Sequence, residues 1–118
     1  MAGLVDAGKN LLLEGLATGV SYVSLHTADP NGTGSDEVSA SPYARKSVDW
    51  AAAASASISS ASAIVFDVPG STTIEYLGYW SASTSGTYYG SRALDVSQTY
   101  ATPGTYTIAI GNITETIT

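Results

Sequence analysis

A lone histidine is the residue of this chain best suited to acid–base chemistry. His26 is the single histidine among 118 residues. Nucleophilic catalysis would need a serine and an aspartate positioned beside it. Serines occur throughout the sequence, so pairing one with His26 is unspecific, and no Gly-x-Ser-x-Gly elbow is present. We therefore expect His26 to have a structural role at the end of a strand, and we predict no catalytic residues.

The loop after His26 carries oxygen-bearing side chains at a spacing found in calcium-binding loops. The first, third, fifth and sixth positions of an EF-hand pattern are filled by Asp29, Asn31, Thr33 and Gly34. The last position needs a bidentate glutamate but holds Ala40. We therefore predict a turn-rich loop in which Asp29 caps its own backbone, and no metal site.

Charged residues elsewhere form two further candidate pairs. Asp67 and Glu75 fall on neighbouring predicted strands, where their carboxyl groups would lie about 5–9 Å apart, as in glycoside hydrolases. A β protein with ten acids offers such pairs by chance, so we expect no hydrolysis. Arg45 and Lys46 follow the loop, and a salt bridge is favoured there over contact with an acidic partner surface. The candidate acids are Asp36, Glu37 and Asp49.

Composition excludes several classes of function. Lys and Arg total 4 against 10 for Asp and Glu, a net charge of −6, which argues against binding nucleic acid or an anionic membrane. The chain has no cysteine, and one histidine cannot form a zinc cluster, so no cofactor or metal is predicted. The longest apolar run is Trp50–Ala54, far too short to span a bilayer, so we expect no transmembrane helix. The N-terminus has no basic segment and an early acid, Asp6, so we expect no secretory signal.

The N-terminal segment has the hydrophobic period of an α-helix. The pattern predicts a helix over Gly3–Thr18, with Gly19 as its stop. Its apolar stripe is formed by Leu4, Leu11, Leu12 and Leu16. Gly8 and Gly15 each lower helix propensity by roughly 1 kcal/mol relative to alanine. We therefore expect packing, on this chain or on a neighbour, to hold the helix.

Beyond residue 19 the hydrophobic period changes to two. Strands are predicted over Val20–His26, Tyr43–Trp50, Ala63–Val68, Thr73–Ser81, Thr87–Leu94, Thr105–Ile110 and Ile113–Ile117. Thr73–Ser81 has two apolar faces, which is typical of a central strand, and forms a hairpin with Thr87–Leu94. The Ala/Ser run Ala51–Ala61 is interpreted as a loop leading to a short strand, rather than as a helix. Turns about every ten residues predict a mainly β fold, an antiparallel β-sandwich or jelly-roll-like barrel with one N-terminal α-helix. We expect one domain over residues 1–118, with the helix in 1–19 and the β-sandwich in 20–118.

Aromatic residues follow the predicted sheets. The set comprises Tyr76, Tyr79, Trp80, Tyr88, Tyr89, Tyr100 and Tyr106. Exposed, they would form a platform for sugar or protein, since Tyr and Trp are enriched at interfaces. Buried, they would be core residues and cross-strand pairs. Alternation places about half of them inside, so both interpretations stay open.

Two sequence blocks resemble a known family. The first is the run YVSLHTADP at Tyr22–Pro30, followed by Gly32-Thr33-Gly34, Glu37-Val38 and Tyr43-Ala44-Arg45. The second is IEYLGYWSASTSG at Ile74–Gly86. Together they resemble small virion proteins of tailed phages that infect actinobacteria, often labelled tail-fibre-like. Asn31, between Pro30 and Gly32, departs from that pattern and lengthens the turn.

The resemblance implies a non-enzymatic structural protein of the virion, assembled in the host cytoplasm. A fibre shaft needs long repeats, which this chain lacks, so we favour a capsid decoration or cement protein. The alternative is a tail-fibre or tail-tip component that binds host glycan through an aromatic face. We expect major capsid or tail proteins as partners, and a homo-oligomer, with a trimer favoured. The predicted interface residues are Leu4, Leu11, Leu12, Leu16, Tyr79, Tyr88 and Tyr89.

Overall fold

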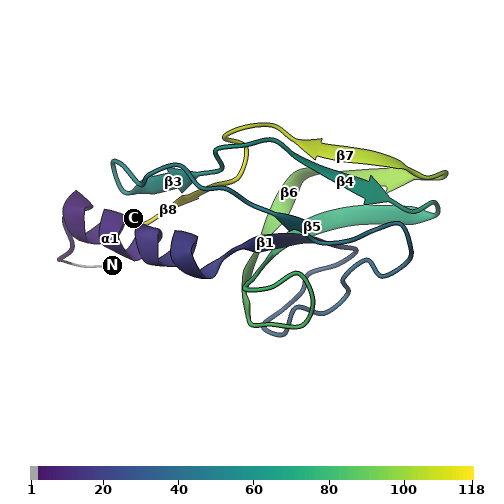
Figure 1. The fold of residues 1–118 in the computed structure, drawn as a ribbon, viewed down its shortest axis with the longest axis horizontal. Helices are drawn as coiled ribbons and strands as arrows, with labels where there is room; N and C mark the ends of the chain where they lie inside the picture. The colour runs from purple at the N-terminus through teal and green to yellow at the C-terminus, as the bar shows by residue number, and fades with distance from the viewer. Residues whose placement is uncertain (1–2) are drawn as a thin grey trace.

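In residues 3–118, which the computed structural model describes, an N-terminal helix leads into eight β-strands (Figure 1). The elements are α1 (Asp6–Gly19), β1 (Tyr22–His26), β2 (Lys46–Ser47), β3 (Ser57–Ser59), β4 (Ile64–Val68), β5 (Thr72–Trp80), β6 (Tyr88–Tyr100), β7 (Gly104–Ile108) and β8 (Thr114–Thr116). The molecule measures 48 × 26 × 22 Å, and α1 occupies one end of its long axis (Figure 1). No helix of the described residues is long and apolar enough to span a bilayer.

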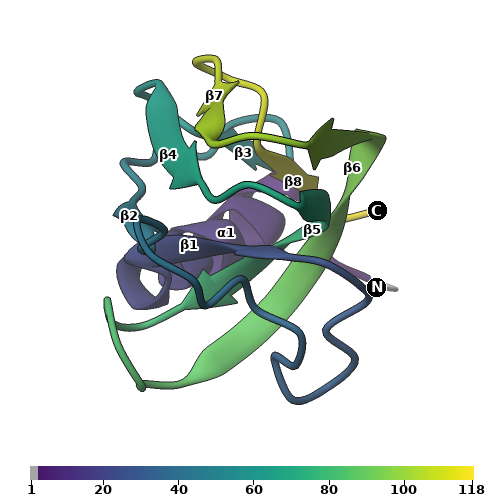
Figure 2. The ribbon, with the colours of Figure 1, turned by 90° about the vertical axis from the view of Figure 1, so that its right-hand side faces the viewer.

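The strands form two layers around one apolar core. One layer is an antiparallel sheet in the order β2-β1-β5-β6, and the β4–β7 pair packs over its inner face (Figure 2). The core between them includes Val23, Leu25, Phe66, Ile74, Leu77 and Ile108. This arrangement confirms the predicted mainly β, antiparallel sandwich with a single helix. The second layer is divided into two separate pairs, β4–β7 and β3–β8, rather than one continuous sheet.

The predicted central strand is confirmed. β5 lies between β1 and β6, and its hairpin with β6 is present. The side chains of β1 alternate, with Val23 and Leu25 in the core and Ser24 and His26 on the opposite face of the sheet. Residues on both faces are buried. The outer face of the sheet therefore also has a cover, which the loop between β1 and β2 supplies.

The helix buries only part of the apolar stripe that the sequence pattern indicated. Leu13 is buried and Leu16 packs against the core, whereas Leu11 is 74 % and Leu12 45 % exposed. The helix begins at Asp6 rather than Gly3, and it ends because Val20 turns to an extended backbone, with Gly19 still helical. Strand β3 packs against α1.

Two strand boundaries also differ from the prediction. The strand expected over Tyr43–Trp50 is reduced to β2, because its large side chains serve as anchors: the Trp50 indole Nε1–H donates to the Val20 carbonyl at 3.0 Å. β6 continues six residues beyond Leu94, past a register shift, and ends at Tyr100. The Ala/Ser run is a loop containing the short strand β3, as predicted.

Side chains of α1 hold that Ala/Ser loop in place. The Asn10 amide oxygen accepts from the Ala56 backbone N–H at 2.9 Å, and the Glu14 carboxylate accepts from the Ala53 N–H at 2.6 Å. Ser55 and Ala56 have φ values of 51° and 61°, a left-handed conformation that is costly for residues with a Cβ. The polar side of α1 thus compensates the strain of the loop and ties the helix to β3.

Candidate functional site

His26 is part of a buried hydrogen-bonded chain rather than an exposed catalytic pair. Its Nδ1 lies 2.7 Å from the Ser35 carbonyl oxygen, which can only accept, so Nδ1 carries the proton. In the neutral ring Nε2 accepts from the Ser24 hydroxyl at 2.6 Å, and Ser24 in turn accepts from the Trp80 indole N–H at 2.8 Å. Burial is the largest influence on His26 and lowers its pKa. Ser24 and His26 have no exposed surface, which supports the expected structural role.

Arg45 connects the two loops that cover the outer face of the sheet. Its guanidinium pairs with both carboxylate oxygens of Glu37, each at 2.9 Å, so Glu37 is the acid among the three candidates. The same group donates to the backbone carbonyls of Ala82, at 3.0 Å, and Ser85, at 2.8 Å. It also stacks 3.7 Å above the Trp80 ring. Arg45 thus holds the two loops together through hydrogen bonds and ring stacking. Guanidinium groups are well suited to such bidentate and stacked contacts.

The carboxylates of Asp29, Asp67 and Glu75 lie in three separate parts of the fold. The Asp29 carboxylate accepts from the Asn31 N–H at 2.8 Å, which is the predicted capped turn. Asp67 lies on β4, which pairs with β7, whereas Glu75 lies on β5, which pairs with β1 and β6. The expectation that these two strands are neighbours is wrong, because they belong to different layers. Within residues 3–118, no group of three or more acidic or histidine side chains is placed to hold a metal ion.

The aromatic residues are divided between the core and the partly exposed surface. Tyr79 and Trp80 are buried, with 4 % and 8 % of their surface exposed. Tyr88 is half-buried and lies against Trp80, with ring centroids 5.2 Å apart. Tyr89 is 50 % exposed, and its ring faces Gly19 of α1. Tyr79 is therefore inaccessible in this chain, while Tyr89 borders the helix.

The outward side of α1 is apolar. Leu11, Leu12 and Gly15 lie within one turn of each other and are all exposed. Val5, at 72 % exposed, extends this surface toward the start of the helix. Of the predicted interface residues, Leu16 faces the core and Leu4 is half-buried, so Leu11 and Leu12 are the most accessible. We call Val5, Leu11, Leu12 and Gly15 the α1 surface.

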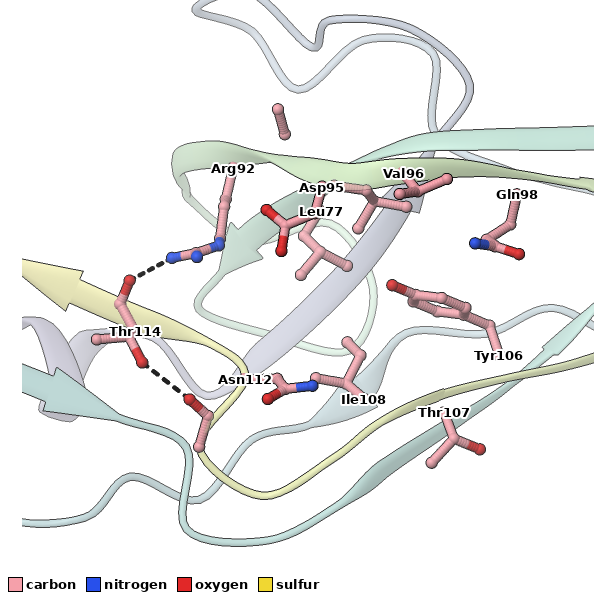
Figure 3. A pocket seen from close by; sticks show the side chains of 13 residues that line it. Leu77, Arg92, Asp95, Val96, Gln98, Tyr106, Thr107, Ile108, Asn112 and Thr114 are labelled. Carbon is pink, nitrogen blue, oxygen red and sulfur yellow. Dashed lines mark hydrogen bonds between the residues drawn. The ribbon is translucent and has the colours of Figure 1, made fainter.

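A groove that the sequence analysis missed lies between β6 and β7 (Figure 3). It has a volume of about 470 Å³. Its polar lining residues include Arg92, Asp95, Gln98, Tyr106, Asn112 and Thr114. These residues are scattered over β6, β7, the segment before β8 and the first residue of β8, without a motif. Only the length and register of β6 bring them together, and those could not be inferred from hydrophobic periodicity.

The fold and the surfaces together define the class of protein. It is a β-sandwich in which the buried polar clusters stabilise the fold, and its single helix exposes an apolar side. Residues 10–116 match the family described as podophage GP4 fiber I protein gp80. The match covers most of the chain, which therefore belongs to this family of phage fibre proteins and is a structural protein of a bacteriophage. No curated protein matches the sequence.

Proposed function

We propose that this protein is a non-enzymatic subunit of a fibre on a tailed-phage virion, and that it assembles with copies of itself through the α1 surface. The family description names a fibre, and this supports placing the fibre ahead of capsid decoration, the role that chain length alone favoured. Other virion proteins, tail or capsid, would anchor the assembly. An actinobacterial host stays a prediction from sequence resemblance.

The observation that carries the proposal is the exposure of leucine on α1. Leu11 exposes 74 % of its surface and Leu12 45 %, and burying a leucine side chain contributes roughly 1.5–3 kcal/mol. Apart from its chain neighbours and the adjacent backbone of α1, no atom of residues 3–118 would lie within 4 Å of a Cβ placed on Gly15. Alanine there would favour the helix by roughly 1 kcal/mol. Glycine is instead suited to the close approach of another backbone.

A second copy of the same helix is the occupant that fits this surface. The α1 surface carries no charged side chain, so identical helices can meet there without burying like charges. α1 runs along the long axis of the molecule at one end (Figure 1). Three helices around a common axis would therefore give an elongated, fibre-like assembly with cyclic symmetry. Tyr89, beside Gly19, would lie at the border of this contact.

Sedimentation velocity on the full chain tests the proposal. We expect a trimer that dissociates on dilution, and a monomer for the double variant Leu11→Ser with Leu12→Ser. Val65→Ser is the matched control, since Val65 is also exposed, at 49 %, but lies on β4. The control should assemble like the wild type. A wild-type chain that stays monomeric, or a double variant that assembles unchanged, would contradict the proposal.

A further inference from the structure

The groove between β6 and β7 is shaped by an irregularity in β6. Ile74 of β5 pairs with Gln98, and Tyr76 pairs with Ala93, so Leu94–Ser97 lie opposite the single residue Glu75. Insertions of this kind bend a strand and redirect its side chains, and they are over-represented beside functional sites. Asp95 and Val96 lie on this bulge and form one wall of the groove (Figure 3).

The groove presents hydrogen-bonding groups that the chain itself does not use. Among the described residues, the side chains of Asp95, Gln98 and Asn112 have no hydrogen-bond partner, nor does the Tyr106 hydroxyl. Tyr106 projects from β7 toward Asp95 on β6 (Figure 3). Burial raises the pKa of Tyr106, and the nearby charges of Tyr100 and Asp95 add to this effect. One carboxylate, two amides and one phenol thus surround the same hollow.

The rest of the lining consists of an apolar floor and a fixed cation. Leu77 and Ile108 are buried core residues whose surfaces close the bottom of the groove. Arg92 is engaged at one end, where it donates to the Thr114 carbonyl and lies 3.5 Å from the Glu115 carboxylate. The free charge in the groove is therefore the carboxylate of Asp95.

We propose that this groove binds a neutral saccharide of one or two rings. Neighbouring hydroxyls of a sugar are both donors and acceptors, and planar carboxylate and amide groups pair with them at fixed angles. The ring of Tyr106 and the apolar floor would contact the C–H face of the sugar. The volume of about 470 Å³ lies within the usual range of roughly 300–1,000 Å³ for small-molecule sites.

The charge of the site selects against acidic ligands. An unpaired Asp95 carboxylate, in a chain of net charge −6, repels sulfated or carboxylated sugars and phosphate. A protein segment is also disfavoured, because the cores of protein interfaces are depleted of charged residues. This inference uses no residue of the α1 surface, so it stands or fails independently of the assembly proposed above.

An NMR titration of the isotopically labelled full chain tests the inference. The probes are glucose, galactose, mannose, arabinose, N-acetylglucosamine, maltose and lactose, added singly. At least one probe should shift the backbone amides of residues 92–98 and 106–112 and reach saturation. Asp95→Asn and Gln98→Ala should each weaken its affinity about tenfold. Asp67→Asn, an exposed carboxylate on β4, is the control and should bind like the wild type.

Four outcomes would overturn the inference. In the first, no probe shifts any groove amide. In the second, saturable shifts fall on the Tyr88–Tyr89 end of β6 while the groove is unaffected. In the third, the Asp95→Asn and Gln98→Ala variants bind as tightly as the wild type. Groove shifts that follow protein dilution rather than added sugar would also overturn it, since they would make the groove a contact between copies. Thermal unfolding of each variant confirms that it is folded.

Discussion

At the residue scale, the two sequence blocks that carry the family resemblance meet in one buried cluster. Ser24 and His26 come from the first block, and Gly78 and Trp80 come from the second, on the neighbouring strand β5, where Gly78 pairs with Ser24. A Cβ on Gly78 would lie 2.6 Å from His26 Nε2 and closer still to Ser24 Oγ. The hydrogen-bonded chain from Trp80 to His26 therefore depends on glycine at position 78.

Gly78→Ala should destabilise the fold by about 1–3 kcal/mol, the usual cost of overpacking a core. Chemical denaturation measures the change in the free energy of unfolding. Gly15→Ala is the control for introducing a methyl group, because nothing within 4 Å of that position would clash. Equal stability of the Gly78→Ala variant and the wild type would show that the cluster tolerates rearrangement.

Folding stability should decrease as the pH falls from about 7.5 to about 5.5. Desolvation lowers the pKa of His26 below its ordinary value of 6.5, so the unfolded chain binds a proton more readily than the folded one. The contribution of neutral His26 is complete above the unfolded pKa and is lost as the pH falls through 6.5 toward the folded pKa. Denaturation at several pH values measures this slope. His26→Gln should flatten it, and an unchanged slope in that variant would assign the effect to other groups.

At the scale of elements, hydrophobic periodicity predicted the type of most segments but not which side each would bury. The predicted stripe contains Leu16, which packs against the core, together with Leu11 and Leu12, which are exposed. A helix with leucine on two sides gives no period-based criterion for choosing the core side. Tyr43–Trp50 has the alternation of a strand, yet side-chain anchors fix it with only a two-residue ladder.

The candidate sites were predictable only where a pattern was local. The Asp29 turn and the salt bridge of Arg45 depend on residues near one another in sequence, and both were expected. The groove depends on the pairing of Gln98 with Ile74, a long-range register that no local pattern specifies. The separation of Asp67 from Glu75 depends in the same way on the order of strands in two layers.

Gly15→Ala separates helix stability from helix contact. In the isolated chain the substitution should stabilise α1 by up to about 1 kcal/mol, since alanine is the better helix former and the space is open. If copies pack through the α1 surface, the added methyl group should weaken assembly. Thermal unfolding at low protein concentration and sedimentation at high concentration measure the two effects. A variant that is more stable and assembles equally well would place the contact elsewhere.

At the scale of the whole molecule, the family match and the elongated shape support a fibre component. The chain measures 48 × 26 × 22 Å, with the α1 surface at one end. Self-association at that end would leave the β-sandwich, including the groove between β6 and β7, directed away from the axis. Such a subunit would combine an assembly end with an exposed surface for other contacts.

Cryo-electron microscopy of the intact virion tests the central claim most directly. We predict density for this chain in a fibre at the tail, with copies meeting through α1 around a symmetry axis. Density repeated over the capsid lattice would contradict the fibre role and restore the decoration role. Density in a fibre whose copies meet through β-strands, with α1 facing solvent, would contradict the proposed mode of assembly.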